Sequence, residues 1–243
     1  MKIAFANKQL PSGTPNGVSV QVHILANELQ KMGHSVTCYS FSEKPPDSLY
    51  EHVRLLWGTD SRVKRKFVPA MKFRAIRTQD YDIVHYHGDD YLCKGALNRV
   101  RTFYGSAVRE AVSAKKVNRF LYQALFYAFE LISSRKKGTL VGISKDTLKC
   151  IPSVKHEIPC GVPLELFREG GQKSPTPSIL FVGDLESRKR GNLLLSIFKN
   201  EVLSEYPECI LTIVGSQFCS APNVRYLGNI PVESLVEEYQ KSW

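Results

Sequence analysis

A strand, a turn-rich loop, a helix and a second strand follow one another at the start of the chain. Residues 2–7 are mostly apolar, and the loop of residues 8–16 is rich in proline and glycine. From Gly17, apolar residues recur at helical spacing up to Met32, and residues 35–41 then alternate as in a strand. Parallel strands need a crossover element between them, and a helix supplies it. This order therefore predicts a parallel α/β sheet.

The same rhythm continues through the chain. It predicts strands at 82–88, 139–142, 179–182, 210–214 and 224–227, and helices at 117–132, 192–198 and 232–243, with Ser144 as the N-cap of a further helix.

The chain is predicted to form two Rossmann-like domains. Residues 1–169 make the first domain, and residues 170–178, which are rich in Gly, Ser and Pro, make a linker. Residues 179–243 begin a second domain. A doubly wound domain usually has about six strands. The second domain has only three predicted strands, so we expect it to be incomplete, as in a truncated chain.

The positive charge is concentrated in the first part of the chain. Residues 1–163 carry 25 Lys and Arg against 13 Asp and Glu, whereas residues 164–243 carry 8 against 10. Residues 61–79 hold seven basic side chains and no acid. Such a field attracts phosphate on a small molecule, an anionic membrane surface or a nucleic acid, although a solvated helix face explains a single cluster equally well. No nucleic-acid-binding motif is present, so no nucleic acid is expected as a partner.

The location and the metal content are predicted from what the sequence does not contain. No apolar run approaches the roughly 20 residues of a membrane-spanning helix, and the N-terminus is too short in its apolar part for a secretory signal. We therefore expect a cytoplasmic protein, at most peripheral at an anionic membrane through its basic N-terminal domain. The six cysteines form no C-x-x-C pair. They are expected to be ordinary core residues, with no metal site.

Two segments are candidates for phosphate binding. Gly17 follows the first strand and its loop and opens the first helix, where exposed N–H groups favour an anion; a simple tight turn is the equal alternative. The fingerprint G-x-G-x-x-G is absent here, which argues against a nicotinamide or flavin enzyme. Arg188, Lys189 and Arg190 lie between a strand and a helix start. Cations are disfavoured at a helix N-terminus, so they indicate a bound diphosphate; the alternative is an exposed basic turn.

The chain resembles the retaining GT-B glycosyltransferases of the group 1 or family 4 type, which include sucrose synthases and bacterial mannosyltransferases. Five segments carry the resemblance over nearly the whole chain: PNGVSV (15–20), YDIVHYHG (81–88), IPCGVPLELF (158–167), ILFVGDLESRKRG (179–191) and LTIVG (211–215).

The resemblance implies the GT-B architecture and a role for several residues. Gly17 would lie near the donor phosphates, and Lys189 and Arg190, with Arg188 beside them, would clamp the diphosphate. These cations would stabilise charge on the departing nucleotide without a metal, so no cofactor is expected beyond the nucleotide-sugar donor. An unknown acceptor would be bound by residues 1–163.

Three departures from the family pattern affect this hypothesis. Asp184 replaces an arginine that commonly follows the strand glycine, and Tyr104 occupies the position of a histidine that contacts the donor sugar. Tyr104 and His87 are therefore the candidate catalytic residues, whereas His85 is expected to be a hydrogen-bonded core residue. The family's two donor-binding glutamates have no counterpart here. The leading hypothesis is transfer of a sugar from a nucleotide-diphosphate donor with retention of configuration, or an inactive truncated form. The alternative is a non-catalytic protein binding a phosphorylated ligand or an anionic membrane.

Overall fold

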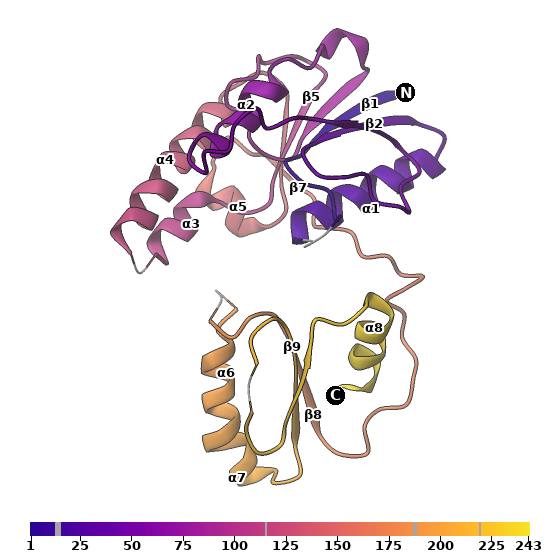
Figure 1. Cartoon of the computed structure of the whole chain (residues 1–243), viewed down its shortest axis with the longest axis vertical. Helices are drawn as coiled ribbons and strands as arrows, with labels where there is room; N and C mark the ends of the chain where they lie inside the picture. Colours follow the sequence, from indigo (N-terminus) through magenta and orange to yellow (C-terminus); the bar gives the residue numbers. More distant parts are fainter. Residues whose placement is uncertain (13–15, 115, 187–188, 219) are drawn as a thin grey trace. The chain divides into compact units, whose positions relative to one another are not determined.

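The computed structural model describes residues 1–12, 16–114, 116–186, 189–218 and 220–243 (Figure 1). It contains two compact units, Met1–Gly161 and Val162–Trp243. This division lies ahead of the predicted domain end at residue 169. Residues of the predicted linker are part of the second unit, where the Ser174 amide donates to the Lys241 carbonyl at 2.9 Å and the Trp243 indole donates to the Ser174 carbonyl at 2.9 Å.

The first unit is built on a seven-stranded sheet with the order β3-β2-β1-β4-β5-β6-β7. All neighbouring strands in it are parallel. The strands are β1 (Lys2–Ala6), β2 (Ser35–Ser40), β3 (Glu51–Arg54), β4 (Ile83–Tyr86), β5 (Arg99–Phe103), β6 (Thr139–Gly142) and β7 (His156–Glu157).

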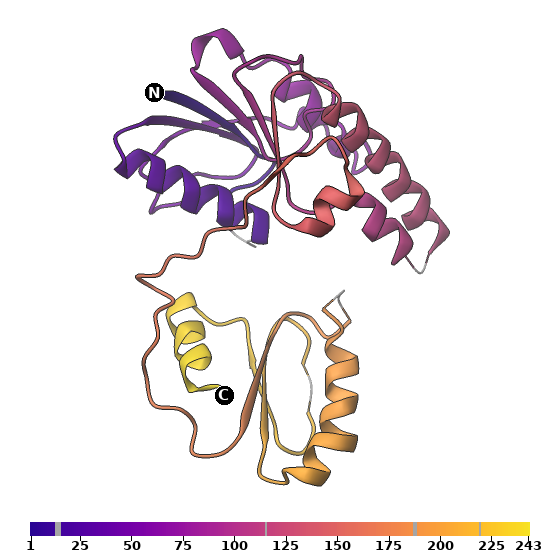
Figure 2. The same cartoon turned by 180° about the vertical axis from the view of Figure 1, so that it is seen from behind.

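Helices cover both faces of this sheet, as the contacts of alternate side chains along β1 indicate. Ile3 and Phe5 belong to one core cluster with Val22 of α1, whereas Ala4 belongs to a separate cluster with Phe73 of α2. Successive side chains of a strand point to opposite faces, so α1 and α2 cover different faces of the sheet. Figures 1 and 2 show α1 running alongside β1 and β2. The helices are α1 (Gly17–Lys31), α2 (Val68–Phe73), α3 (Ala107–Val112), α4 (Val117–Ser134) and α5 (Lys145–Cys150), with short 3-10 turns η1 (Lys64–Lys66) and η2 (Thr78–Asp80).

Side-chain caps define where two of the predicted helices begin. The Asn16 side chain accepts from the Ser19 amide at 2.9 Å, and the Ser19 hydroxyl accepts from the Asn16 amide at 3.0 Å. This capping box satisfies two backbone donors that the helix leaves unpaired. The Ser144 hydroxyl accepts from the Thr147 amide at 3.3 Å, which confirms the predicted N-cap of α5.

The second unit has a three-stranded parallel sheet with the order β10-β9-β8. Phe198, Leu211 and Ile213 lie at the centre of its core. Its elements are β8 (Ser178–Val182), α6 (Gly191–Ile197), the π-helical turn η3 (Phe198–Val202), α7 (Leu203–Glu205), β9 (Ile210–Val214), β10 (Val224–Gly228) and α8 (Val232–Lys241). The predicted α/β class, with parallel sheets in both parts of the chain, is confirmed.

Candidate functional site

The strand order of the first unit reverses between β1 and β4. Ligands of open parallel sheets bind at such a reversal, beyond the carboxyl ends of the strands. Ala6 pairs with Tyr86, so β1 and β4 end at the same level, and the His87 amide donates to the Ala6 carbonyl at 3.0 Å. The residues after these two strands therefore line the carboxyl edge of the sheet where a ligand is expected.

Gly17 is the first residue of α1, the helix that follows β1 in the chain. A Cβ added to Gly17 would meet no atom within 4 Å. The described chain therefore does not itself require glycine there. Pro15, at the start of the PNGVSV segment, lies outside the described residues.

His87 and Tyr104 are brought together at this edge. His87 follows β4, Tyr104 follows the adjacent β5, and the His87 Nδ1 lies 2.9 Å from the Tyr104 hydroxyl. The His87 Nε2 is buried and has no hydrogen-bond partner among the described residues. Burial, the His85 ring and the Arg101 charge hold the pKa of His87 well below its usual range, so the imidazole is neutral. Burial also raises the pKa of Tyr104. The pair therefore offers hydrogen bonds rather than charge.

His85 lies on β4, beside this pair. Its Nε2 is 2.8 Å from the Thr102 hydroxyl, and its ring meets the Phe5 ring edge-on at 5.2 Å between centroids. Burial and the nearby Arg101 lower its pKa to about 3. His85 is thus a neutral, hydrogen-bonded residue packed on β1.

A buried charged cluster lies next to the pair, and it was not predicted. The Asp90 carboxylate is contacted by Arg99, whose Nε lies at 3.1 Å, and by the Ser133 hydroxyl at 2.6 Å. The Arg101 Nε lies 3.2 Å from the Asp90 oxygen that accepts from Ser133, whereas Arg99 contacts the second oxygen. Burial alone would raise the pKa of Asp90, but Arg101 and Arg99 outweigh it and lower that pKa. The Lys136 ammonium donates to the Cys93 carbonyl at 2.6 Å and also to the Asp90 and Tyr91 carbonyls, so it ties the segment after β4 to the end of α4.

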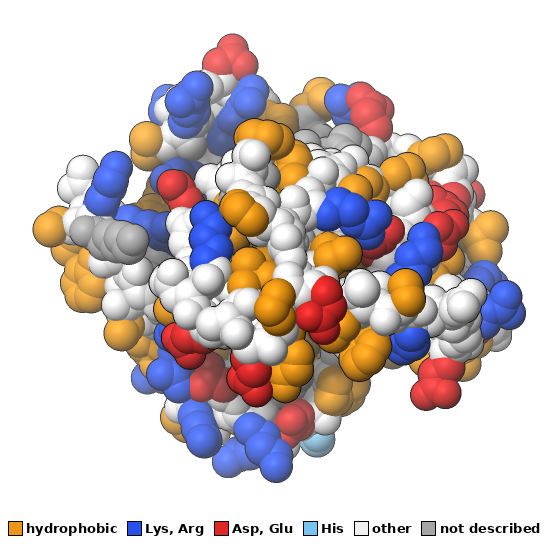
Figure 3. All heavy atoms as spheres, turned by 90° about the horizontal axis from the view of Figure 1, so that it is seen from below, with side chains coloured by type: hydrophobic (Ala, Val, Ile, Leu, Met, Phe, Trp, Pro, Cys, Tyr) orange, Lys and Arg blue, Asp and Glu red, His pale blue; other side chains and the backbone are white. Residues whose placement is uncertain are grey.

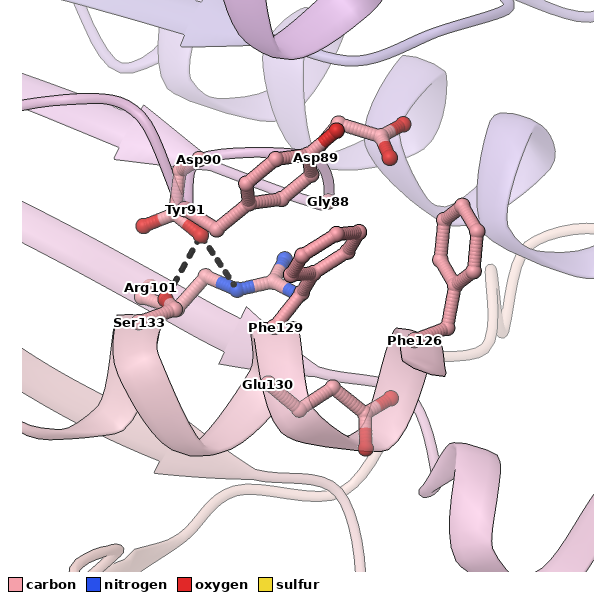
Figure 4. Close-up of a pocket in the computed structure, with 9 residues that line it drawn as sticks. All are labelled: Gly88, Asp89, Asp90, Tyr91, Arg101, Phe126, Phe129, Glu130 and Ser133. Carbon is pink, nitrogen blue, oxygen red and sulfur yellow. Dashed lines mark hydrogen bonds and ion pairs between the residues drawn. The ribbon is translucent and has the colours of Figure 1, made fainter. Parts of the chain in front are cut away.

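A hollow of about 190 Å³ opens beside this cluster. Asp89, in the loop after β4, and Glu130, on α4, both line it. In Figure 4 their carboxylates lie on either side of the Phe126 and Phe129 rings, and Arg101 lies behind Phe129. Glu130 also caps α3, because it accepts from the Ser106 hydroxyl at 2.8 Å and from the Ala107 amide at 3.0 Å. Burial raises the pKa of both Asp89 and Glu130.

Two of the predicted phosphate ligands lie at the carboxyl end of β8 in the second unit. The Lys189 Nζ donates to the Val182 carbonyl at 2.8 Å, and its side chain lies over Gly183, where a Cβ would meet the Lys189 Cδ at 2.7 Å. Arg190 is exposed and immediately precedes α6, with a φ of 59° in the left-handed region. Arg188 lies outside the described residues.

Asp184, the departure in this segment, is bound within the same edge. Its carboxylate accepts from both the amide and the hydroxyl of Ser216, which follows β9. These bonds lower the pKa of Asp184, so it is ionised. Asp184 therefore joins the loops after β8 and β9.

The basic segment of residues 61–79 lies around η1 and α2. The Lys66 Nζ lies 3.7 Å from the centre of the Tyr122 ring, and Arg65 pairs with Asp60 at 3.1 Å.

On the face drawn in Figure 3, Lys and Arg side chains are interspersed with Asp and Glu. Among the described residues, no helix is both long enough and apolar enough to pass through a bilayer.

Comparison with known proteins identifies the architecture. The family model described as Glycosyltransferase Family 4 matches residues 15–166. The solved sucrose-phosphate synthase from Thermosynechococcus elongatus is similar with a TM-score of 0.70 and 17% identity, over 99% of this chain and 73% of that chain. WaaG, a glycosyltransferase involved in lipopolysaccharide biosynthesis, gives a TM-score of 0.68 and 16% identity, over 100% and 73%.

A third solved structure agrees with these two. The glycosyltransferase from Rickettsia africae gives a TM-score of 0.58 and 16% identity, over 99% of this chain and 71% of that chain. No curated protein matches the chain. At these identities the likenesses establish the fold, and they confirm the predicted GT-B architecture.

Proposed function

Because the chain belongs to glycosyltransferase family 4, we propose that it transfers a sugar from a nucleoside-diphosphate sugar to an acceptor, with retention of the anomeric configuration. The first unit would hold the acceptor, and the second would hold the diphosphate of the donor. Lys189 and Arg190 would stabilise the charge that develops on the departing nucleoside diphosphate, so the proposed transfer requires no metal.

The observation that carries this proposal is the place of Lys189 and Arg190 in the second unit. Both follow the carboxyl end of a parallel strand, which is where ligands of such sheets bind. Arg190 is exposed and lies directly before the helix. A guanidinium can bind two phosphate oxygens at once, which suits a diphosphate. Lys189 is instead held by the Val182 carbonyl, so we expect Arg190 to carry the larger part of the nucleotide affinity.

The test is nucleotide binding to the chain as it stands, measured by thermal shift and calorimetry with UDP, GDP and ADP. We expect one nucleotide to stabilise the chain, and Arg190→Asn to weaken its binding by about 10- to 100-fold, since hydrogen bonds to charged groups contribute about 1.5–3 kcal/mol. Asparagine tolerates the left-handed backbone of this position, so the replacement removes the charge without adding strain.

Lys199→Asn provides the matched control. Lys199 is an exposed cation of the same unit, and it lies in η3, beyond the far end of α6. The Lys199→Asn replacement should leave nucleotide binding unchanged. Equal binding by Arg190→Asn and the unaltered chain would refute the diphosphate site, and no binding of any nucleotide would refute the donor proposal itself.

Retention can be tested with water as the acceptor. The sugar released by slow hydrolysis of the bound donor would be followed by proton NMR before its anomers equilibrate. The proposal expects the anomer of the donor to appear first, and the opposite anomer would contradict it.

A non-catalytic protein for phosphorylated ligands is the second candidate. Tyr104 favours it, because this residue occupies the position of a histidine that contacts the donor sugar in the resembling family, and its raised pKa leaves it a poor proton donor. Nucleotide binding that depends on Arg190, with no turnover of any bound nucleotide sugar in the presence of a range of acceptors, would favour this candidate over the transferase.

A further inference from the structure

The hollow between the β4 loop and α4 contains features that the proposed donor site does not explain. Its lining comes from the loop after β4, from Arg101 of β5 and from α4, which contributes Phe126, Phe129 and Glu130; all of these are in the first unit. Gly88, which lines the hollow, directly follows His87 in the chain. We propose that the hollow is the acceptor subsite and binds a single neutral sugar ring, an inference that rests on the proposed sugar transfer.

The polar groups around the hollow indicate a polar ligand. The Arg101 side chain is 9% exposed, and its Nε lies 3.2 Å from the Asp90 carboxylate, so this charge is already paired within the protein. The Tyr91 hydroxyl, by contrast, is buried without a hydrogen-bond partner among the described residues. Buried polar groups are nearly always hydrogen-bonded, and an unmet one costs about 1–3 kcal/mol. A ligand bearing hydroxyl groups would supply a partner for the Tyr91 hydroxyl.

The aromatic side chains indicate that part of this ligand is apolar. Tyr91 and Phe129 stack with centroids 4.1 Å apart, and Phe126 meets Phe129 nearly perpendicularly at 5.5 Å. Phe126 and Phe129 line the hollow, and in Figure 4 their rings lie between the Asp89 and Glu130 carboxylates. A sugar ring combines an apolar C–H face with a rim of hydroxyls. It would therefore pack on the rings and donate to the carboxylates.

The balance of charge favours a neutral ligand over an ionic one. Three acids, Asp89, Asp90 and Glu130, lie at the hollow or in its wall, and three bases, Arg99, Arg101 and Lys136, lie in or beside the charged cluster. A phosphate would meet the Asp89 and Glu130 carboxylates at close range, and an ammonium group would meet Arg101. Because acids and bases nearly balance around the hollow, neither an anion nor a cation would meet a net opposite charge there, and a neutral ligand avoids both repulsions.

The size of the hollow limits the ligand to one ring. Its volume of about 190 Å³ is below the roughly 300–1,000 Å³ of sites for drug-sized molecules. One pyranose with its substituents is the unit that we expect to be enclosed, and any remainder of the acceptor would lie outside.

The test measures binding of methyl glycosides of glucose, galactose, mannose and N-acetylglucosamine to the whole chain by saturation-transfer NMR. We expect a signal from at least one of them, and its loss in Asp89→Asn. That replacement keeps the shape and tolerates the left-handed φ of 52° at this position, while removing the charged acceptor. Phe126→Leu should weaken the same signal by removing the ring. Asp60→Asn, at an exposed carboxylate of the same unit, should retain it.

The outcomes separate this inference from the proposed function. Nucleotide binding that depends on Arg190, without any signal from a neutral glycoside, would overturn the subsite and leave the donor proposal standing. A glycoside signal that depends on Asp89, without nucleotide binding, would support the subsite and refute the donor proposal. Stronger signals from glucuronate or glucose 6-phosphate than from the neutral glycosides, or a signal unchanged in Asp89→Asn, would overturn the inference.

Discussion

Asp90 is a position at which a single substitution should strongly destabilise the first unit. Its side chain is 1% exposed, and the Arg99 and Arg101 side chains that contact it are 0% and 9% exposed. Asp90→Ala would leave two buried guanidinium groups and the Ser133 hydroxyl without their shared acceptor.

The expected loss follows from the cost of an unpaired buried charge. Removing one partner of a buried ion pair typically costs about 3–5 kcal/mol, whereas whole domains are stable by only about 5–15 kcal/mol. Asp90→Ala should therefore lower the free energy of unfolding of the first unit by about 3–5 kcal/mol. Asp82→Ala is the control, since Asp82 is exposed and accepts from the Lys2 amide at 2.7 Å. Its loss should cost about 0.5–1.5 kcal/mol.

The assay is urea denaturation followed by Trp57 fluorescence in a Trp243→Phe background. The two tryptophans lie in different units, so this background makes the signal specific for the first unit. Trp57 stacks on Phe41 with centroids 4.1 Å apart, and unfolding would change its emission. If Asp90→Ala lowered the free energy of unfolding by less than about 1 kcal/mol, or by no more than Asp82→Ala does, the cluster would not stabilise the first unit in the way proposed.

Two further predictions concern packing and pH. Gly191→Ala should destabilise the second unit by about 1–3 kcal/mol, because the new Cβ would lie 2.7 Å from the Leu185 Cα and 2.8 Å from the Phe181 ring; an unchanged Trp243 unfolding midpoint in a Trp57→Phe background would contradict this. His85 has a folded pKa of about 3, below the roughly 6.5 of an unfolded histidine. The unfolded state therefore binds the proton first, and stability of the first unit should fall as the pH drops below about 6.5. His85→Gln should reduce this slope in urea titrations at several pH values, and a slope that does not change would refute the assignment.

Local patterns were sufficient for the longer elements. The apolar spacing after Gly17 predicted α1, which ends at Lys31, and that of residues 117–132 predicted α4, which extends to Ser134. Short elements such as β3 and α2 were missed. Their four and six residues are too few to show a period, and β3 is largely exposed at the sheet edge.

The residues of the candidate site, too, could be predicted from the sequence only in part. His87 and Tyr104 were singled out from motifs, but their contact depends on β4 and β5 being neighbours, which no local signal specifies. Arg99, Arg101 and Ser133 were missed, because each is an ordinary polar residue until long-range folding buries it beside Asp90. The available clue was the spacing of Arg99 and Arg101, which occupy alternate positions and so face the same side of a strand.

The amino-acid sequence by itself determined the α/β class, the family resemblance and the basic pair Lys189 and Arg190, because strand and helix periods and short motifs are local properties. The tertiary structure alone decided the division after Gly161, the buried cluster around Asp90 and the hollow beside it. The cluster depends on contacts between residues 9 to 46 positions apart in the chain. Burial turns such contacts into large energies, since a charge that water would screen must then be met by the protein itself.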